Sequence, residues 1–150
     1  MTSGAVARPD PIDSLRRPTK AYSAGQVAAA TFLGSPIAGC LLLRSNFELF
    51  GVHEAARRSV VWGLLGTCVS LALAMVVPEN TPNALIPALY TLALQQIAAR
   101  TQGARLVSFF ENGGPKHSHW RVVGIGLGCL AIAVVALFAV IMILPPELIE

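Results

Sequence analysis

All eleven lysine and arginine residues of this chain lie in three blocks, Arg8 to Lys20, Arg44 to Arg58 and Arg100 to Arg121, with long apolar stretches between and after them. The longest stretch, residues 122–144, runs for 23 residues without a formal charge. At 1.5 Å per residue, a helix of this length crosses a hydrocarbon core about 30 Å thick. The pattern predicts an all-α integral membrane protein.

The composition agrees with this interpretation. Hydrophobic residues make up 54% of the chain and charged residues only 13%, whereas soluble domains carry about a quarter charged residues. The formal net charge is +3, but the basic residues flank apolar segments and are not interleaved with aromatic residues on a polar domain. The expected partner of these flanks is the lipid bilayer, and we expect no nucleic acid.

Two further stretches are predicted to span the membrane. Residues 59–77 are apolar, begin directly after Arg58 and end just before Pro78. These 19 residues are long enough to cross the membrane. Residues 83–99 give a weaker signal because this segment is shorter and contains polar side chains. Thr81 followed by Pro82 is typical of a helix N-terminus, so this helix is expected to start there.

The first apolar segment, residues 23–43, is interrupted by the sequence Gly34-Ser35-Pro36. Serine followed by proline predicts that Ser35 caps a new helix that begins at Pro36. Ser23 and Gln26 have the spacing of a capping box for a short helix over about residues 24–33. Ten residues rise about 15 Å, half the hydrocarbon core. The segment is therefore predicted to be a broken or re-entrant helix, which enters and leaves the membrane on the same side.

Counting the positive charges on each side separates the topologies. Four spanning helices divide the lysines and arginines seven to four, whereas a re-entrant first segment with three spanning helices places all eleven on one side. The positive-inside rule favours three spanning helices with a cytoplasmic N-terminus, in the cytoplasmic (inner) membrane of a bacterium. The four-span arrangement is the alternative.

The chain is expected to form one membrane domain, residues 23–150, after a flexible cytoplasmic tail over residues 1–22, which holds three prolines and four basic residues. The blocks 44–58 and 104–111 mix aromatic, aliphatic and charged residues. They suit either helices on the membrane surface or cytoplasmic extensions of the spanning helices.

Two groups of residues inside the apolar segments are candidates for helix packing or for a polar site. Small residues four positions apart let helix backbones approach closely in lipid; they are Gly66, Ser70 and Ala74 on one segment, and Gly124 and Gly128 on another. The amides Gln26, Gln95 and Gln96 are predicted either to hydrogen-bond between helices or to line a small polar site.

No motif indicates catalysis, a cofactor or a metal centre. His117 and His119 are close in sequence, with Glu111 upstream, but the intervening residues 112–115 are typical of a turn. A metal needs a third converging ligand, and His53 belongs to another block. We expect these histidines to lie in a loop in contact with solvent or headgroups.

Several strings resemble a group of small bacterial integral membrane proteins whose role is uncharacterised. They are Tyr22-Ser23-Ala24-Gly25-Gln26, the run from Ala30 to Gly39, Pro78-Glu79-Asn80, Pro82-Asn83, Glu111-Asn112-Gly113-Gly114 with His117-Ser118 and Trp120, and Gly124-Ile125-Gly126. The resemblance covers most of the chain after the tail, and it implies no activity, cofactor or catalytic residue.

The sequence thus favours a small non-enzymatic membrane protein that interacts with a second copy of itself or with another membrane protein. The alternative is a small transporter or channel subunit, with a polar path at Gln26, Gln95, Gln96 and the break from Gly34 to Pro36. No acidic or basic residue lies within a predicted span, which argues against proton coupling and charged substrates.

Overall fold

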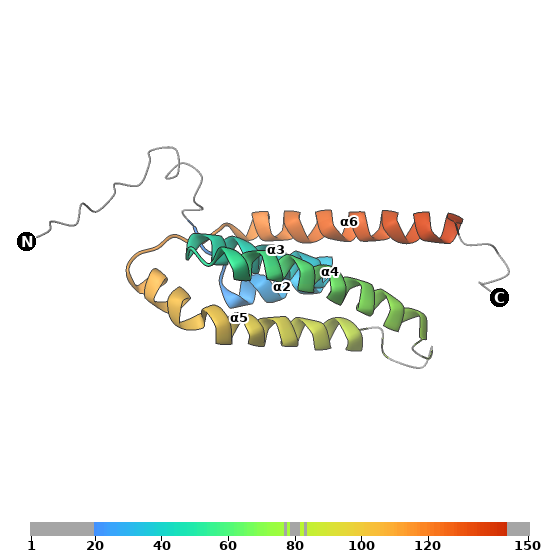
Figure 1. Ribbon diagram of the computed structural model, residues 1–150, viewed down its shortest axis with the longest axis horizontal. Coiled ribbons are helices and arrows are strands. Elements are labelled where there is room, and N and C mark those ends of the chain that lie inside the picture. The colour runs from blue at the N-terminus through green and yellow to red at the C-terminus, as the bar shows by residue number, and fades with distance from the viewer. Residues whose placement is uncertain (1–19, 77, 79–81, 83, 144–150) are drawn as a thin grey trace, which may run out of the picture.

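The computed structural model describes residues 20–76, 78, 82 and 84–143, and this part of the chain forms five α-helices (Figure 1). The helices are α2 (Ala24–Gly34), α3 (Pro36–Leu49), α4 (His53–Val76), α5 (Leu85–Glu111) and α6 (His119–Ile143). Outside them, the described residues contain one isolated parallel bridge, between Ala21 and Lys116. The all-helical fold class is confirmed.

Helices α2 and α3 are the two halves of the interrupted segment. The predicted capping box is present at the start of α2: the Ser23 hydroxyl accepts from the Gln26 amide at 3.3 Å, and Gln26 Oε1 accepts from the Ser23 amide at 3.0 Å. Helix α3 begins at Pro36, as predicted. It continues to Leu49, past the expected end at residue 43, because the helical spacing of apolar residues runs on into the basic block.

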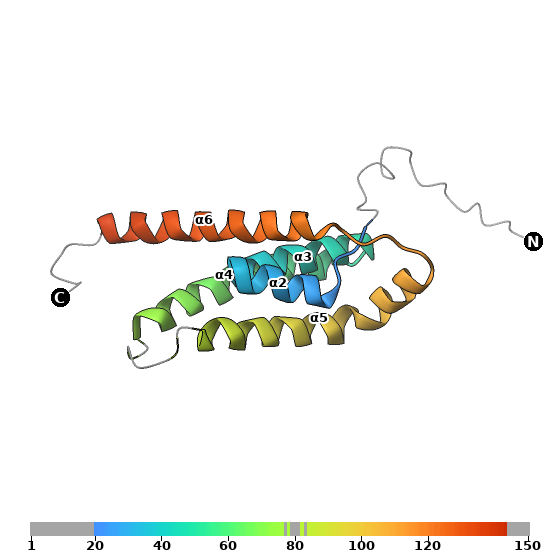
Figure 2. The ribbon, with the colours of Figure 1, turned by 180° about the vertical axis from the view of Figure 1, so that it is seen from behind.

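The two halves form a hairpin at the centre of the molecule, called the α2–α3 hairpin below. The start of α2 and the end of α3 form the open end of the hairpin. This open end lies at the same end of the molecule as the α5–α6 loop, and the α4–α5 connection lies at the opposite end (Figure 1). Seen from either side, α5 and α6 flank the hairpin, and α6 continues well past its tip (Figure 2). The hairpin therefore fills only one half of the length of the bundle.

The core lies where the long helices pack on this hairpin. Its fully buried apolar side chains include Val27, Ala30 and Leu42 of the hairpin, Ala98 of α5 and Val122 of α6. Such small and medium side chains allow the short helices to lie close to their neighbours.

Glycines make the closest crossings. A Cβ atom on Gly34, at the hairpin tip, would lie 2.7 Å from the Cα of Gly126 on α6. On the other side of the hairpin, a Cβ on Gly63 of α4 would lie 2.6 Å from the Cβ of Cys40. A side chain at either position would force the two helices apart, so both crossings require glycine.

Helix α6 qualifies as a membrane span by length and composition. Its segment His119–Ala139 has a mean hydropathy of 2.7, and only 11% of the apolar window is buried. Most of this segment is exposed, whereas a core helix of a soluble domain passes the same test while mostly buried. No other described helix meets these criteria, so the prediction of three or four spanning helices is not supported beyond this one helix.

The boundaries of the long helices also differ from the prediction. Helix α4 starts at His53 and α5 continues to Glu111. Of the two arrangements predicted for the basic blocks, the structure therefore has extensions of the long helices and not separate surface helices. Helix α5 begins at Leu85 after Ala84, which makes no side-chain cap. The predicted start at Thr81 and Pro82 is therefore wrong, although Thr81 itself lies outside the described residues.

The predicted flexible tail ends earlier than expected. Ala21 and Tyr22 are buried, because the Ala21 amide donates to the Pro115 carbonyl and the His117 amide donates back to the Ala21 carbonyl, each at 3.1 Å. Residues 1–19 of the tail lie outside the described part. The loop before α6 thus fixes the chain that enters α2.

Candidate functional site

The helix break is held by a residue from a neighbouring helix. Ser35 adopts φ 83° and ψ 169°, a backbone region otherwise occupied almost only by glycine. Its side chain makes no capping hydrogen bond, and its buried hydroxyl has no partner. The prediction that the Ser35 hydroxyl caps α3 is therefore wrong, because the backbone of Ser35 has a positive φ and not the extended dihedrals that are typical of a capping serine.

Thr67 of α4 provides the missing cap. Its Oγ1 accepts from the Ile37 amide at 3.1 Å and donates to the Gly63 carbonyl at 2.8 Å. One of the free amides at the start of α3 is thus satisfied within the protein, which matters wherever water is scarce.

Three buried amides, which we call the amide cluster, join the open end of the hairpin to α5 and to the α5–α6 loop. They are Gln26, Asn46 and Gln102, and each is at most 3% exposed. Asn46 accepts from the Tyr22 amide and donates to the Tyr22 carbonyl, both at 2.8 Å. It also donates to Gln102 Oε1 at 2.9 Å.

The other two amide groups of the cluster donate to main-chain carbonyls. Gln102 Nε2 donates to Leu43 at 3.0 Å, and Gln26 Nε2 donates to His117 at 2.8 Å. Because each side-chain amide group of the cluster donates to a partner within the chain, the cluster acts as a structural clamp and not as an open polar site.

A stacked pair covers this clamp. The rings of Tyr22 and His117 lie 4.1 Å apart at an interplanar angle of 22°. Burial lowers the pKa of His117 below 6.5, and the charges of Arg121 and Lys20 lower it further. A hydrogen bond that the imidazole donates to the main chain of Lys20 raises this pKa and opposes them. Burial also raises the pKa of Tyr22, opposed by Arg121. His117 is therefore engaged in packing, whereas His119 starts α6 and is exposed.

An apolar groove opens between α4 and α5, and its floor is α3. It consists of two adjoining cavities of about 380 and 320 Å³, which share Cys40, Trp62, Leu94 and Ile97 in their linings. We call the two cavities together the lateral groove. The larger cavity, of about 380 Å³, extends past Gly66 and Leu73 towards the α4–α5 connection.

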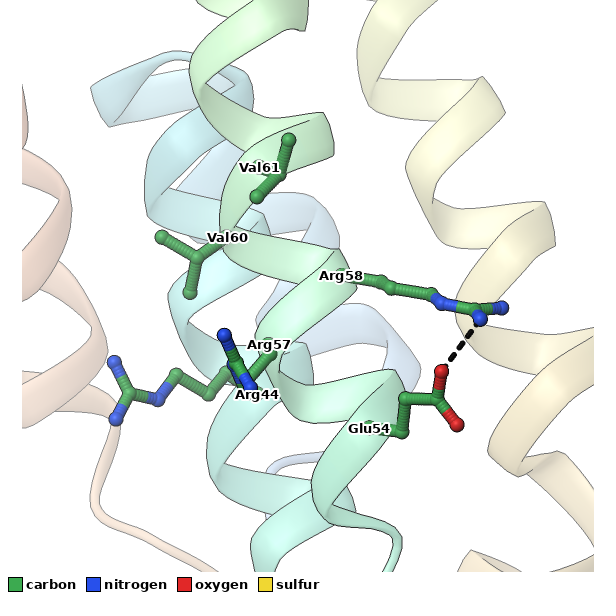
Figure 3. A pocket seen from close by; sticks show the side chains of 6 residues that line it. All are labelled: Arg44, Glu54, Arg57, Arg58, Val60 and Val61. Atoms are coloured by element: carbon green, nitrogen blue, oxygen red, sulfur yellow. Dashed lines mark hydrogen bonds and ion pairs between the residues drawn. The ribbon is translucent and has the colours of Figure 1, made fainter.

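Arg58 lines the other end of the lateral groove. It also borders a third cavity of about 490 Å³, the basic pocket, which is lined by Arg44, Glu54, Arg57, Arg58, Val60 and Val61. In Figure 3 the Arg58 guanidinium is paired with Glu54, at 2.6 Å, and Arg57 and Arg44 lie on the other side of the helix. Arg44 pairs with Glu48 at 2.7 Å. These ion pairs are exposed, so the arginines stay accessible to another anion.

The predicted packing residues divide between two environments. A Cβ on Gly66 would lie 3.2 Å from Pro36 Cβ, so Gly66 packs on the helix break, and Ser70 bonds to the Thr67 carbonyl in its own helix. The side chain of Ala74 lies outside the described part. Gly124 and Gly128 are exposed, and a Cβ on either would meet nothing within 4 Å. They pack against none of the described residues, because the face of α6 against the hairpin carries Gly126.

The three predicted polar-site amides do not meet at a common site. Gln26 is used in its capping box and in the bond to His117. Gln95 is half-buried and Gln96 is exposed, both on α5. None of the three lines the lateral groove or the basic pocket.

Sequence reasoning missed Asn46, Gln102 and Thr67. A signal exists for Gln102, because Leu94, Ala98, Gln102 and Leu106 are spaced by four and form the buried stripe of α5. Asn46 likewise continues the spacing of Ala38 and Leu42 on α3. Asn46 lies in block 44–58, which is predicted to form either surface helices or extensions of the spanning helices, and Gln102 lies just beyond the predicted span 83–99.

Comparisons with models of known protein families, with curated proteins and with solved structures give no match for this chain.

Proposed function

We propose that this chain is a small, non-enzymatic protein of a bacterial cytoplasmic membrane that acts by binding a second copy of itself or another membrane protein. The observation that carries the proposal is the inverted distribution of side chains. Large apolar residues such as Val69, Leu89 and Ile132 are about half exposed or more on the long helices, while the buried side chains include the hydrogen-bonded amide cluster. Exposed apolar surface of this extent is costly in water and costs nothing in lipid.

Helices α4 and α5 are proposed to span with α6. All charged residues of α4 lie near its start, at Glu54, Arg57 and Arg58, and none follows up to Val76. Arg100 and Arg105 lie in the second half of α5. The start of α4, the end of α5 and the start of α6 meet at one end of the molecule (Figure 1), so the described positive charges gather there. By the positive-inside rule this end is cytoplasmic.

In this topology the α2–α3 hairpin enters from the cytoplasm and returns to it. Its broken backbone is covered by α4 and α6, at Thr67 and Gly126. A non-helical break at membrane depth is stable only when it is buried in protein in this way.

The surface proposed for self-association is the side of α6 that carries Gly124 and Gly128. These residues lie two positions from Gly126, which corresponds to about 200° around the helix, so they face away from the hairpin. A GxxxG pair left open on an apolar helix permits close approach of another helix.

Two measurements test this proposal. Reporter fusions at Gly51 and Gly113 should report cytoplasm, and a fusion at Asn80 should report the outside. Purification of the tagged chain in mild detergent should recover either a stoichiometric partner or a homo-oligomer. Release of the chain from membranes by alkaline carbonate would contradict the membrane assignment, and an outside signal at Gly51 would contradict the re-entrant hairpin.

A further inference from the structure

We propose that the lateral groove and the basic pocket together bind one anionic phospholipid of the cytoplasmic leaflet, with an acyl chain in the groove and the headgroup phosphate at Arg58. This inference rests on the membrane assignment proposed above. It names a ligand for a surface that the proposed self-association through α6 does not use.

The first argument is the continuity of apolar and basic surface. Arg58 lines both the basic pocket and the smaller cavity of the lateral groove, of about 320 Å³. Trp62, one turn further along α4, lines both parts of the groove. A ligand that fills the cavities must therefore be apolar along most of its length and anionic at one end.

The second argument is the length of the groove. From Arg58 to Leu73 on α4 there are 15 residues, which correspond to about 22 Å of helix. One leaflet contributes roughly half of a 30 Å hydrocarbon core. The groove is thus long enough for an acyl chain whose headgroup lies at the level of Arg58.

The charge of the pocket selects the headgroup. Three arginines and one glutamate line it, which leaves an excess of two positive charges. Glu54 forms an ion pair with Arg58, and Glu48 forms one with Arg44. Arg57 is exposed on the opposite side of α4 and adds to the positive charge of this end of the helix (Figure 3). A zwitterionic headgroup brings its own cation to this surface, whereas an anionic headgroup does not, so the anionic lipid is favoured.

The two tryptophans of the chain provide a site-specific probe. Trp62 lines the groove, and Trp120 is exposed at the start of α6. The full chain with Trp120→Phe reports on the groove, and the chain with Trp62→Phe is the matched control. Each is reconstituted in phosphatidylcholine vesicles that contain a small fraction of phosphatidylglycerol or phosphatidylcholine with brominated acyl chains, which quench tryptophan fluorescence on contact.

Trp62 should be quenched by brominated phosphatidylglycerol with a roughly fivefold higher apparent affinity than by brominated phosphatidylcholine, the preference that one arginine supplies at a membrane surface. Trp120 should show no such preference. The double substitution Arg57→Gln and Arg58→Gln should remove the preference of Trp62, and the control Arg105→Gln on α5 should keep it. Added salt should weaken the preference of Trp62 for phosphatidylglycerol in the protein that keeps Arg57 and Arg58. This measurement tests the proposal even if the double variant does not fold.

Equal quenching of Trp62 by both lipids would overturn the proposal, as would a preference that survives the double substitution or high salt. These outcomes differ from a failure of the membrane assignment. In that case neither tryptophan would be quenched by any brominated lipid.

Discussion

The backbone amide of Ile37, at the second position of α3, donates a 3.1 Å hydrogen bond to Oγ1 of Thr67 on α4. The same hydroxyl donates to the Gly63 carbonyl, so both of its hydrogen-bonding roles are used. The helix break is thus stabilised by a neighbouring helix and not by the serine that precedes it. Two substitutions follow directly from this contact.

Thr67→Val should lower the free energy of unfolding by about 1 to 3 kcal/mol, because it leaves the Ile37 amide buried without an acceptor. Thr67→Ser keeps the hydroxyl and should recover most of the loss. Thermal unfolding in detergent, followed by circular dichroism, measures both variants. Equal stability of the valine and serine variants would show that the hydroxyl does not cap α3.

Ser35→Gly should stabilise the protein by about 1 kcal/mol, because glycine adopts the observed φ of 83° without the strain that a Cβ atom imposes. Ser35→Ala should be close to neutral, since the serine hydroxyl has no partner to lose. The same thermal measurement applies. A loss of stability in the alanine variant as large as that of Thr67→Val would restore Ser35 as the cap.

Gly34→Ala should cost about 1 to 3 kcal/mol, because the new methyl group would meet the main chain of Gly126 and push α6 away from the hairpin tip. Gly103→Ala on α5 is the matched control. There, alanine has free space and a higher helix propensity, so stability should be unchanged or higher. Similar losses in both variants would contradict the close contact between Gly34 and Gly126.

Asn46→Leu should cost at least about 3 kcal/mol, because the Tyr22 amide and carbonyl and Gln102 Oε1 all lose their partner in a buried place. Gln102→Leu should cost less, since it breaks two hydrogen bonds. A double-mutant cycle should show that the two losses are not additive. Additive losses would mean that the two amides act independently.

Stability should fall as the pH drops below about 6.5, the ordinary pKa of histidine. The pKa of His117 is lowered in the folded protein, so the unfolded chain takes up a proton first and protonation favours unfolding. The loss is absent above this pH and levels off once the pH falls below the folded pKa. His117→Phe keeps a stacking ring on Tyr22 and should flatten the slope between about pH 5 and pH 7. An unchanged slope would assign the pH dependence to other groups.

Local signals in the sequence were sufficient to predict where the two helices of the hairpin begin. The capping box at Ser23 and Gln26 and the proline at the start of α3 involve residues within one turn of each other. Such contacts depend on the local chain alone, so sequence spacing predicts them. The apolar run after Trp120 likewise predicts a long helix whatever its neighbours are.

Local spacing does not predict which face of each helix packs on its neighbours, because this depends on residues distant in sequence. Gly124, Gly126 and Gly128 have the same chemistry, yet only Gly126 meets the hairpin, and this is decided by how α6 is rotated when it packs. The same holds for the lateral groove. It exists because α4 and α5 both pack on α3 and leave space between them, which no spacing within one helix encodes.

The sequence by itself determined that the chain is helical, where it breaks, and which end of each long segment carries the positive charges, since propensity, capping and charge are properties of neighbouring residues. Only the tertiary structure decided that Thr67 caps α3, that Asn46 and Gln102 close the open end of the hairpin, and that Arg58 joins an apolar groove to a basic pocket. Each of these arrangements is fixed by hydrogen bonds and close packing between separate helices. The residues that form the two hydrogen bonds are 30 and 56 positions apart in the sequence.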